Sequence, residues 1–297
     1  MCKQALVTCL GLVALFTSSA WGADTQNQPP DFSGLWGRNA FDLEPMPSGP
    51  QPLTNLKRRP DGTGNFQQLV GDYTNPILKP EAAEIVKKRG EISISGRNFP
   101  DPSNSCGAYN PPYTFTMQLG FEMLQKQDQI TILYNQDDQV RHIRLNGVHP
   151  ANVKPSAMGD SIGHYEGDTL VVDTVGIEVS PLSMTDHYGS PNSPALHVVE
   201  RYRLIEGKAA KAAQEKFEKF IGSVGGVGAP PADLVDVKGL QVELTVEDPD
   251  VFTTPWSALA TYRQRARNWN EQVCADNPIE HYAGEWQGLP KADKPDF

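Results

Sequence analysis

The sequence predicts a mainly β protein: an antiparallel, calycin-like barrel with a few peripheral helices. Short runs rich in Val, Ile, Leu, Tyr and Phe recur from residue 113 onward, and helical patterns are few. Most segments between these runs have the length of hairpin turns, which suits antiparallel strands and is too short for the crossovers of a parallel α/β fold. A β-sandwich has the same pattern of short strands and is the alternative.

The N-terminal segment 1–23 has the features of a secretory signal peptide. Lys3 provides a charged start, residues 5–16 are apolar, and small residues follow. The apolar run is too short to anchor the chain in a bilayer. We therefore expect a periplasmic or secreted protein in which residues 24–297 form a single barrel domain.

The first ordered elements are expected in the coil-rich region that follows. Three large apolar side chains in the segment 31–36 (DFSGLW) are costly to leave in water, so this segment is predicted to be a strand docked on the core. Residues 80–89 (PEAAEIVKKR) are predicted to form a surface helix, because Pro80 suits a first turn and the acidic residues precede the basic ones. Gly90 is expected to end this helix.

The remaining strands follow one another at short intervals. They are predicted at 121–124, 130–134, 140–145, 158–165, 169–175, 197–205, 240–246 and 258–263. Two of them, on either side of Glu166-Gly-Asp168, are expected to form a hairpin. A helix and a Gly- and Pro-rich loop at 208–231 are interpreted as an excursion from a hairpin, since the strand pattern resumes directly afterwards. Residues 264–274 are predicted to be helical.

The charge and the cysteines limit the partners and the compartment. The formal net charge is -10, and an acidic surface repels phosphate backbones and anionic lipids, so neither nucleic acid nor membrane is an expected partner. Once the signal peptide is removed, Cys106 and Cys274 remain. In an oxidising compartment two cysteines most simply form one disulfide, and two buried free thiols are the alternative.

The stretch 149–174 contains most of the residues that could carry chemistry. Gly159-Asp-Ser-Ile-Gly163 matches the G-x-S-x-G pattern of hydrolase nucleophile elbows. That elbow needs a strand before the serine and a helix after it, whereas here a Pro-containing loop precedes Ser161 and a hairpin follows. An esterase-like hydrolase is therefore only the third choice. Asp173 lies on a strand whose two faces both look buried, and it is expected to pair with Arg201 or Arg203.

Polar residues of two strands are predicted to face the interior of the barrel. His142 and Arg144 share a face of one strand, and His197, Arg201 and Arg203 share a face of another. A ligand cavity needs a few polar groups among apolar ones, and these residues are the available set. Three more histidines, His149, His164 and His187, are expected near strand ends, where the mouth of a barrel lies.

The preferred functional hypothesis is proton transfer by histidines that carboxylates orient. His149 and His187 would act as acid and base, and Asp160 and Asp186 would orient them. Arg201 or Tyr165 would stabilise developing negative charge. The substrate would be an apolar or aromatic small molecule held in the barrel, as for a lyase, hydratase or isomerase. A binding protein of lipocalin type, without catalysis, is the competing hypothesis.

Motifs for cofactors and metals are not found in the sequence. No G-x-G-x-x-G, P-loop, H-E-x-x-H or C-x-x-C occurs. His142 and His149 are seven positions apart, which places them on opposite faces of a strand. We therefore expect an enzyme that works without a cofactor and without a metal ion.

Several strings resemble those of a widespread, largely uncharacterised group of secreted bacterial proteins. They are DFSGLW at 31–36, GDSIGHYEGDTLVVDT at 159–174, ERY at 200–202, and EDP and TPW between 247 and 256. The resemblance covers most of the chain from about residue 30 to 280 and implies a calycin-like barrel with a central cavity. The G-x-W opening is also similar to that of lipocalins. The resemblance implies no catalytic residues.

Overall fold

The computed structural model describes residues 28–266, except residues 39, 57–68, 97–98, 103–104, 106, 118–119, 136–138 and 222–232. The predicted signal peptide, the predicted disulfide between Cys106 and Cys274, and the Gly- and Pro-rich loop at 222–231 therefore lie outside the described residues. So does most of the helix predicted at 264–274, although its first two positions belong to the last strand.

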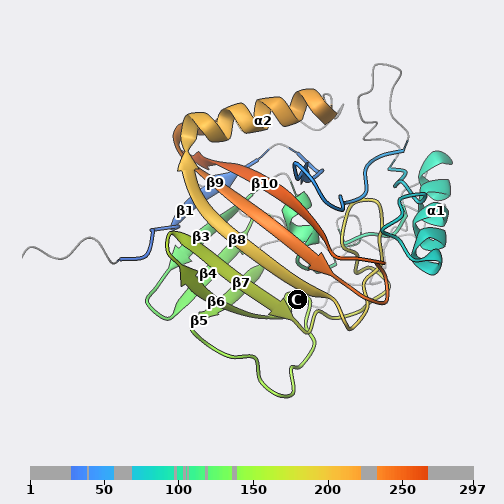
Figure 1. Ribbon diagram of the computed structural model, residues 1–297, viewed down its shortest axis with the longest axis horizontal. Helices are drawn as coiled ribbons and strands as arrows, with labels where there is room; N and C mark the ends of the chain where they lie inside the picture. The colour runs from blue at the N-terminus through green and yellow to red at the C-terminus, as the bar shows by residue number, and fades with distance from the viewer. Residues whose placement is uncertain are drawn as a thin grey trace, which may run out of the picture.

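Within the described residues, nine strands form a closed barrel, which confirms the predicted fold class (Figure 1). In order around the barrel they are β1 (Gly34–Gly37), β3 (Phe121–Gln125), β4 (Gln129–Tyr134), β5 (Val140–Leu145), β6 (Asp160–Glu166), β7 (Thr169–Val175), β8 (His197–Glu206), β9 (Leu234–Glu247) and β10 (Trp256–Arg265). Pairing of β1 with β10 closes the ring, so the sandwich alternative is wrong. A short strand, β2 (Glu44–Pro45), pairs with β10 from outside the ring.

One pair of neighbouring strands departs from the antiparallel pattern. β5 and β6 run parallel, with Ile143 opposite Ser161. Parallel neighbours need a connection that returns along the length of the strands. Residues 146–159 make this connection without a helix, and Figure 1 shows them as a long loop below β5 and β6. This loop carries His149 to the barrel wall.

The interior of the barrel is filled by alternate residues of every strand. Large apolar side chains such as Trp36, Phe121 and Tyr262 are buried there and belong to one contiguous core cluster. Val171 and Val172 on β7 are both buried, which explains the uninterrupted apolar run in the sequence. Gly167 has φ +62°, as the predicted turn between β6 and β7 requires.

In the described part of the chain, two α-helices lie outside the barrel. α1 (Pro80–Ile94) begins at the predicted residue but continues four residues beyond Gly90. The expectation that Gly90 ends it is wrong: a Cβ at Gly90 would lie 2.9 Å from Cγ1 of Val70, so the glycine allows close packing instead. A short 3₁₀ helix, η2, spans Tyr113–Thr116.

The helix α2 (Gly207–Ile221) follows β8 directly and lies across β9 and β10 (Figure 1). The amide of Gln214 fastens it by donating hydrogen bonds to the carbonyl oxygens of Thr261, at 2.9 Å, and Gly37, at 3.3 Å. None of the helices in the described part of the chain has the length and apolar character needed to cross a bilayer.

Candidate functional site

The polar faces of β5 and β8, which were predicted to line the interior of the barrel, face outward instead. On β5 the buried residues are Arg141 and Ile143, and on β8 they are Val198, Glu200 and Tyr202. The residues on the opposite faces, which form the outer wall, are His142, Arg144, His197, Arg201 and Arg203. The prediction was wrong because it placed the more polar faces inside to serve a ligand cavity, whereas those faces point outward.

The interior instead contains a buried ion pair. Arg141 donates two hydrogen bonds to the carboxylate of Glu200, at 2.9 and 3.0 Å, and the two side chains are 1 % and 0 % exposed. Arg141 also donates to the hydroxyls of Ser161 and Thr174, and Tyr202 donates to Glu200 at 2.7 Å. Burial alone would lower the pKa of Arg141, but the adjacent carboxylate outweighs it and raises the pKa.

Ser161 is part of this interior network. Its hydroxyl lies 3.1 Å from Nε of Arg141 and 3.0 Å from the hydroxyl of Thr174, and the residue is buried. Neither partner can take up a proton from the hydroxyl as a histidine would, and β6 continues as a strand beyond the serine. The geometry therefore lacks what a nucleophile elbow requires.

The side chains of Arg144, His149, Asp160, Asp173 and His197 meet on the outside of the barrel, and we refer to these five residues as the outer-wall cluster. Nδ1 of His149 lies 2.7 Å from one carboxylate oxygen of Asp160, as the predicted pairing of these two residues requires. Nε2 of His149 lies 3.1 Å from Oδ1 of Asp173, and Nε2 of His197 lies 3.1 Å from the same oxygen. Arg144 donates two hydrogen bonds to Asp160, at 2.6 and 2.9 Å.

These contacts define where protons lie in the cluster. The hydrogen bonds from Arg144 lower the pKa of Asp160, so this carboxyl is ionised at neutral pH. Both ring nitrogens of His149 face carboxylate oxygens, which only accept hydrogen bonds, so both contacts form when both nitrogens carry hydrogen. His197 uses Nε2 for Asp173, while its Nδ1 makes no hydrogen bond to the described residues.

The expected partners of Asp173 are wrong. Arg201 pairs with Glu166, and Arg203 donates to the hydroxyl of Thr169. The register places Val199 opposite Asp173 and Arg201 opposite Val171, so both arginines lie further along β8. His197, at the start of the same strand, takes the place that we expected for an arginine.

His187 lies apart from the outer-wall cluster, in the loop that follows β7. Its Nε2 donates to the carbonyl oxygen of Thr116 at 2.7 Å, so Nδ1 is the acceptor that faces the hydroxyl of Tyr113 at 3.3 Å. The ring of Phe41 packs edge-on against it. Burial lowers the pKa of His187, which keeps the ring neutral at pH 7. None of these contacts is with His149 or Asp160.

Asp186 accepts hydrogen bonds from the backbone N–H groups of Tyr188, at 2.8 Å, and Ser190, at 3.1 Å. The carboxylate thereby closes a turn in its own loop, and none of these hydrogen bonds goes to the neighbouring ring of His187. Burial raises the pKa of Asp186, against the effect of the two hydrogen bonds.

The two residues expected to stabilise negative charge are also separate from the cluster. The ring of Tyr165 stacks on Phe32 with centroids 6.5 Å apart, and burial raises the pKa of its hydroxyl. That hydroxyl is buried and has no hydrogen-bond partner among the described residues. Arg201 remains on the outer wall with Glu166. The structure thus joins His149 with Asp160 and leaves His187, Asp186, Arg201 and Tyr165 elsewhere.

Sequence reasoning missed Asp173 and His197 as parts of one site with His149. The signal that could have found them is strand order: β6, β7 and β8 are neighbours, and outward-facing residues of neighbouring strands lie side by side. The described residues contain no group of three or more His, Cys, Asp or Glu side chains placed to hold a metal ion.

Comparison of the chain with family models, with curated protein sequences and with solved structures finds no match in any of the three.

Proposed function

We propose that the protein is an enzyme that transfers protons to and from a small molecule at the outer-wall cluster, as a lyase, hydratase or isomerase does. The observation that carries this proposal is the sharing of one carboxylate oxygen of Asp173 by His149 and His197, each at 3.1 Å. Two imidazoles with different hydrogen-bonding patterns lie next to each other there, and one substrate can reach both.

The two histidines have different roles in the proposal. His197 is the base, because Asp173 holds its Nε2 and its Nδ1 is free to accept a proton from carbon. His149 is the acid: Nδ1–H stays on Asp160, and Nε2–H leaves Oδ1 of Asp173 to give its proton to the substrate. In a dehydration, His197 takes the proton next to a carbonyl group and His149 gives a proton to the departing hydroxyl, which leaves as water.

Asp160 and Arg144 support the acid without touching the substrate. The carboxylate of Asp160 fixes the orientation of the His149 ring, and the two hydrogen bonds from Arg144 keep that carboxylate ionised. They are positioning residues in the same sense as the carboxylate that orients a catalytic histidine in other enzymes.

Access to the cluster also supports the proposal. The side chains of His149 and His197 are 22 % and 35 % exposed, so a substrate can reach both rings. Val148, next to His149, is 81 % exposed and offers an apolar contact. This surface suits an apolar or aromatic small molecule. The proposed enzyme is exported and needs neither a cofactor nor a metal ion.

The test uses 4-hydroxy-4-phenylbutan-2-one, which has an aromatic ring, an acidic C–H group and a hydroxyl leaving group. Formation of the conjugated ketone is followed by absorbance, and deuterium uptake in heavy water is followed by NMR. His197→Asn should lower kcat/KM by about a hundredfold or more, the contribution typical of a general base. His142→Asn is the matched control, because His142 is exposed on β5 and contacts Gln129 and Thr131.

Equal turnover by wild type and His197→Asn would contradict the assignment of the base. Absence of both turnover and deuterium uptake with the wild-type protein would contradict the enzyme proposal and favour the competing function, binding of a small molecule without catalysis.

A further inference from the structure

His149 and His197, the acid and the base of the proposed reaction, lie close to each other. Nε2 of each ring is 3.1 Å from Oδ1 of Asp173, so these two nitrogens are separated by no more than about twice that distance. Nδ1 of His197, the proposed base, belongs to the same small ring. A hydrogen atom and a hydroxyl group on adjacent carbon atoms fit between two groups at this spacing. Both histidines can thus act on neighbouring atoms of one substrate.

Neighbouring strands hold the two rings against the same wall of the barrel. Asp160 on β6 and Asp173 on β7 contact the two nitrogens of His149, at 2.7 and 3.1 Å, so this ring lies along the wall although its backbone belongs to the loop before β6. His197 begins β8, which pairs with β7. Outward-facing residues of adjacent strands share one surface. The acid and the base therefore reach a bound molecule from the same side.

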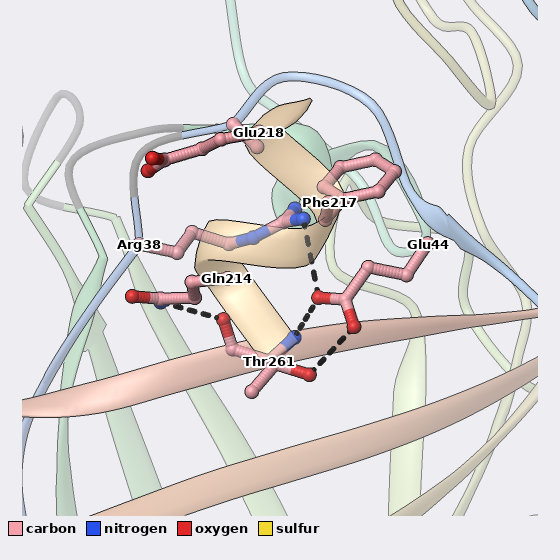
Figure 2. A pocket seen from close by; sticks show the side chains of 7 residues that line it. Arg38, Glu44, Gln214, Phe217, Glu218 and Thr261 are labelled. Atoms are coloured by element: carbon pink, nitrogen blue, oxygen red, sulfur yellow. Dashed lines mark hydrogen bonds and ion pairs between the residues drawn. The ribbon is translucent and has the colours of Figure 1, made fainter. Parts of the chain in front are cut away.

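The wall is open at the two histidines and covered further round the barrel. Thr261 on β10 also points outward, but it is 0 % exposed because Glu44 and α2 lie over it (Figure 2). The carboxylate of Glu44 accepts hydrogen bonds from the backbone N–H and the hydroxyl of Thr261, at 2.8 and 2.7 Å, and the amide of Gln214 on α2 donates to its carbonyl oxygen. By contrast, the side chains of His197 and Asp173 are 35 % and 38 % exposed. A substrate at the cluster consequently has the wall on one face and water on the other.

This one-sided arrangement determines the stereochemistry of a dehydration. Loss of the hydrogen and the hydroxyl from opposite faces of a molecule requires the acid and the base to stand on opposite sides of it. Two groups on one wall instead reach a hydrogen and a hydroxyl on the same face, because each bond that breaks must be aligned with the group that acts on it. The geometry therefore suits syn elimination.

We propose, on the basis of the proposed proton-transfer function, that the substrates are β-hydroxy carbonyl compounds and that the protein removes water from them by syn elimination. Nδ1 of His197 takes the proton from the carbon next to the carbonyl group, and the electron pair of that C–H bond forms the C=C bond by way of the enolate. The C–O bond breaks with its electron pair on oxygen, which takes the proton from Nε2 of His149 and leaves as water. Substituents on the water-facing side of the substrate make no contact with the cluster.

The experiment uses two diastereomers of 4-hydroxy-4-phenylbutan-2-one that carry one deuterium at C3, each in one of the two positions. In the conformation that leads to the E enone, the deuterium of the first lies on the same side as the hydroxyl, and that of the second lies on the opposite side. Mass spectrometry of the enone formed in ordinary water should show loss of deuterium from the first diastereomer and its retention from the second. Incubation without protein measures the spontaneous exchange at C3. His142→Asn, a change on the outer wall outside the cluster, should give the wild-type pattern.

The opposite pattern, or equal loss from both diastereomers, would overturn syn elimination and leave the proton-transfer function intact. If the ketone exchanges hydrogen at C3 without losing water, the recovered ketone is analysed in the same way. Exchange confined to the position beside the hydroxyl supports proton removal from one face, and exchange at both positions contradicts it. Absence of both the enone and the exchange contradicts the proposed function itself, and syn elimination with it.

Discussion

Two of the charged clusters in the described part of the barrel each join an arginine to a carboxylate, and they differ in their access to water. The interior network of Arg141, Glu200, Ser161 and Thr174 is sealed, and its arginine has hydrogen-bond partners on all sides. The outer-wall cluster is partly exposed, and a nitrogen of His197 makes no hydrogen bond to the described residues. A network whose hydrogen-bonding groups all have partners stabilises the structure. A histidine nitrogen without a partner, on a ring oriented by a carboxylate, can instead accept a proton. Burial and the presence of histidine together therefore separate the two roles.

The largest expected effect comes from breaking the interior network. Arg141→Met leaves the carboxylate of Glu200 buried without its cation and should lower the free energy of unfolding by about 3–5 kcal/mol. Urea denaturation measures this loss. The double variant Arg141→Met with Glu200→Met removes both charges and should recover part of the stability. A loss below about 1 kcal/mol in the single variant would mean that the network is not what holds this part of the barrel.

The second effect concerns turnover. Asp160→Asn keeps the shape of the side chain but removes the charge that orients and supports His149, so kcat/KM should fall by about tenfold or more. The urea midpoint should change little, because Arg144, the partner of Asp160, is 44 % exposed and ion pairs open to water contribute about 0–1 kcal/mol. Steady-state kinetics and denaturation of the same preparation measure both quantities. Unchanged kcat/KM would remove Asp160 from the mechanism.

The third effect is a dependence of stability on pH that arises at His187, away from both clusters. Burial lowers the pKa of this ring below its ordinary value of 6.5, so the unfolded chain binds a proton in a range where the folded chain does not. The free energy of unfolding is therefore highest above pH 6.5. It decreases as the pH falls toward the pKa of His187 in the folded state, by at most about 1.4 kcal/mol for each pH unit.

Urea midpoints between pH 7.5 and 5 check this expectation against His187→Gln. The glutamine variant is less stable at pH 7.5, and its stability should fall less steeply than that of the wild type as the pH is lowered. Parallel curves for the two proteins would contradict the burial of a neutral ring.

The smallest effect is expected for the pair of Arg201 and Glu166 on the outer wall. The two side chains are 32 % and 49 % exposed, so salt and water screen their attraction. Arg201→Gln should leave the urea midpoint and kcat/KM within experimental error of the wild type. A clear loss of turnover would restore the expected role of Arg201 in stabilising negative charge.

The positions of the strands were predictable from the sequence, and their faces were not. Alternation placed β3, β4 and β5 within a residue of their observed bounds, and the turn at Gly167 was recognised from its residue types. The inward face of β5 carries Arg141 and the outward face carries His142 and Arg144, so the two faces differ by only one polar residue. The burial of Arg141 depends on its ion pair with Glu200, which forms only in the closed barrel.

The candidate site was predictable where it depends on neighbours in sequence. His149 and Asp160 flank one loop, and their contact was expected from that loop alone. The contact of Asp173 with His197 depends on the register between β7 and β8, which hydropathy patterns do not reveal. The burial of His187 depends on η2 and on the segment around Phe41, both distant in sequence.

The most direct test of the division between a structural interior and a reactive outer wall is the variant Asp173→Asn, measured for both turnover and stability. Asp173 is the one carboxylate that both proposed catalytic histidines contact. With 4-hydroxy-4-phenylbutan-2-one as the substrate, kcat/KM should fall by about a hundredfold or more, while the free energy of unfolding stays within about 1 kcal/mol of the wild-type value. Unchanged turnover, or a loss of stability as large as that of Arg141→Met, would contradict the account.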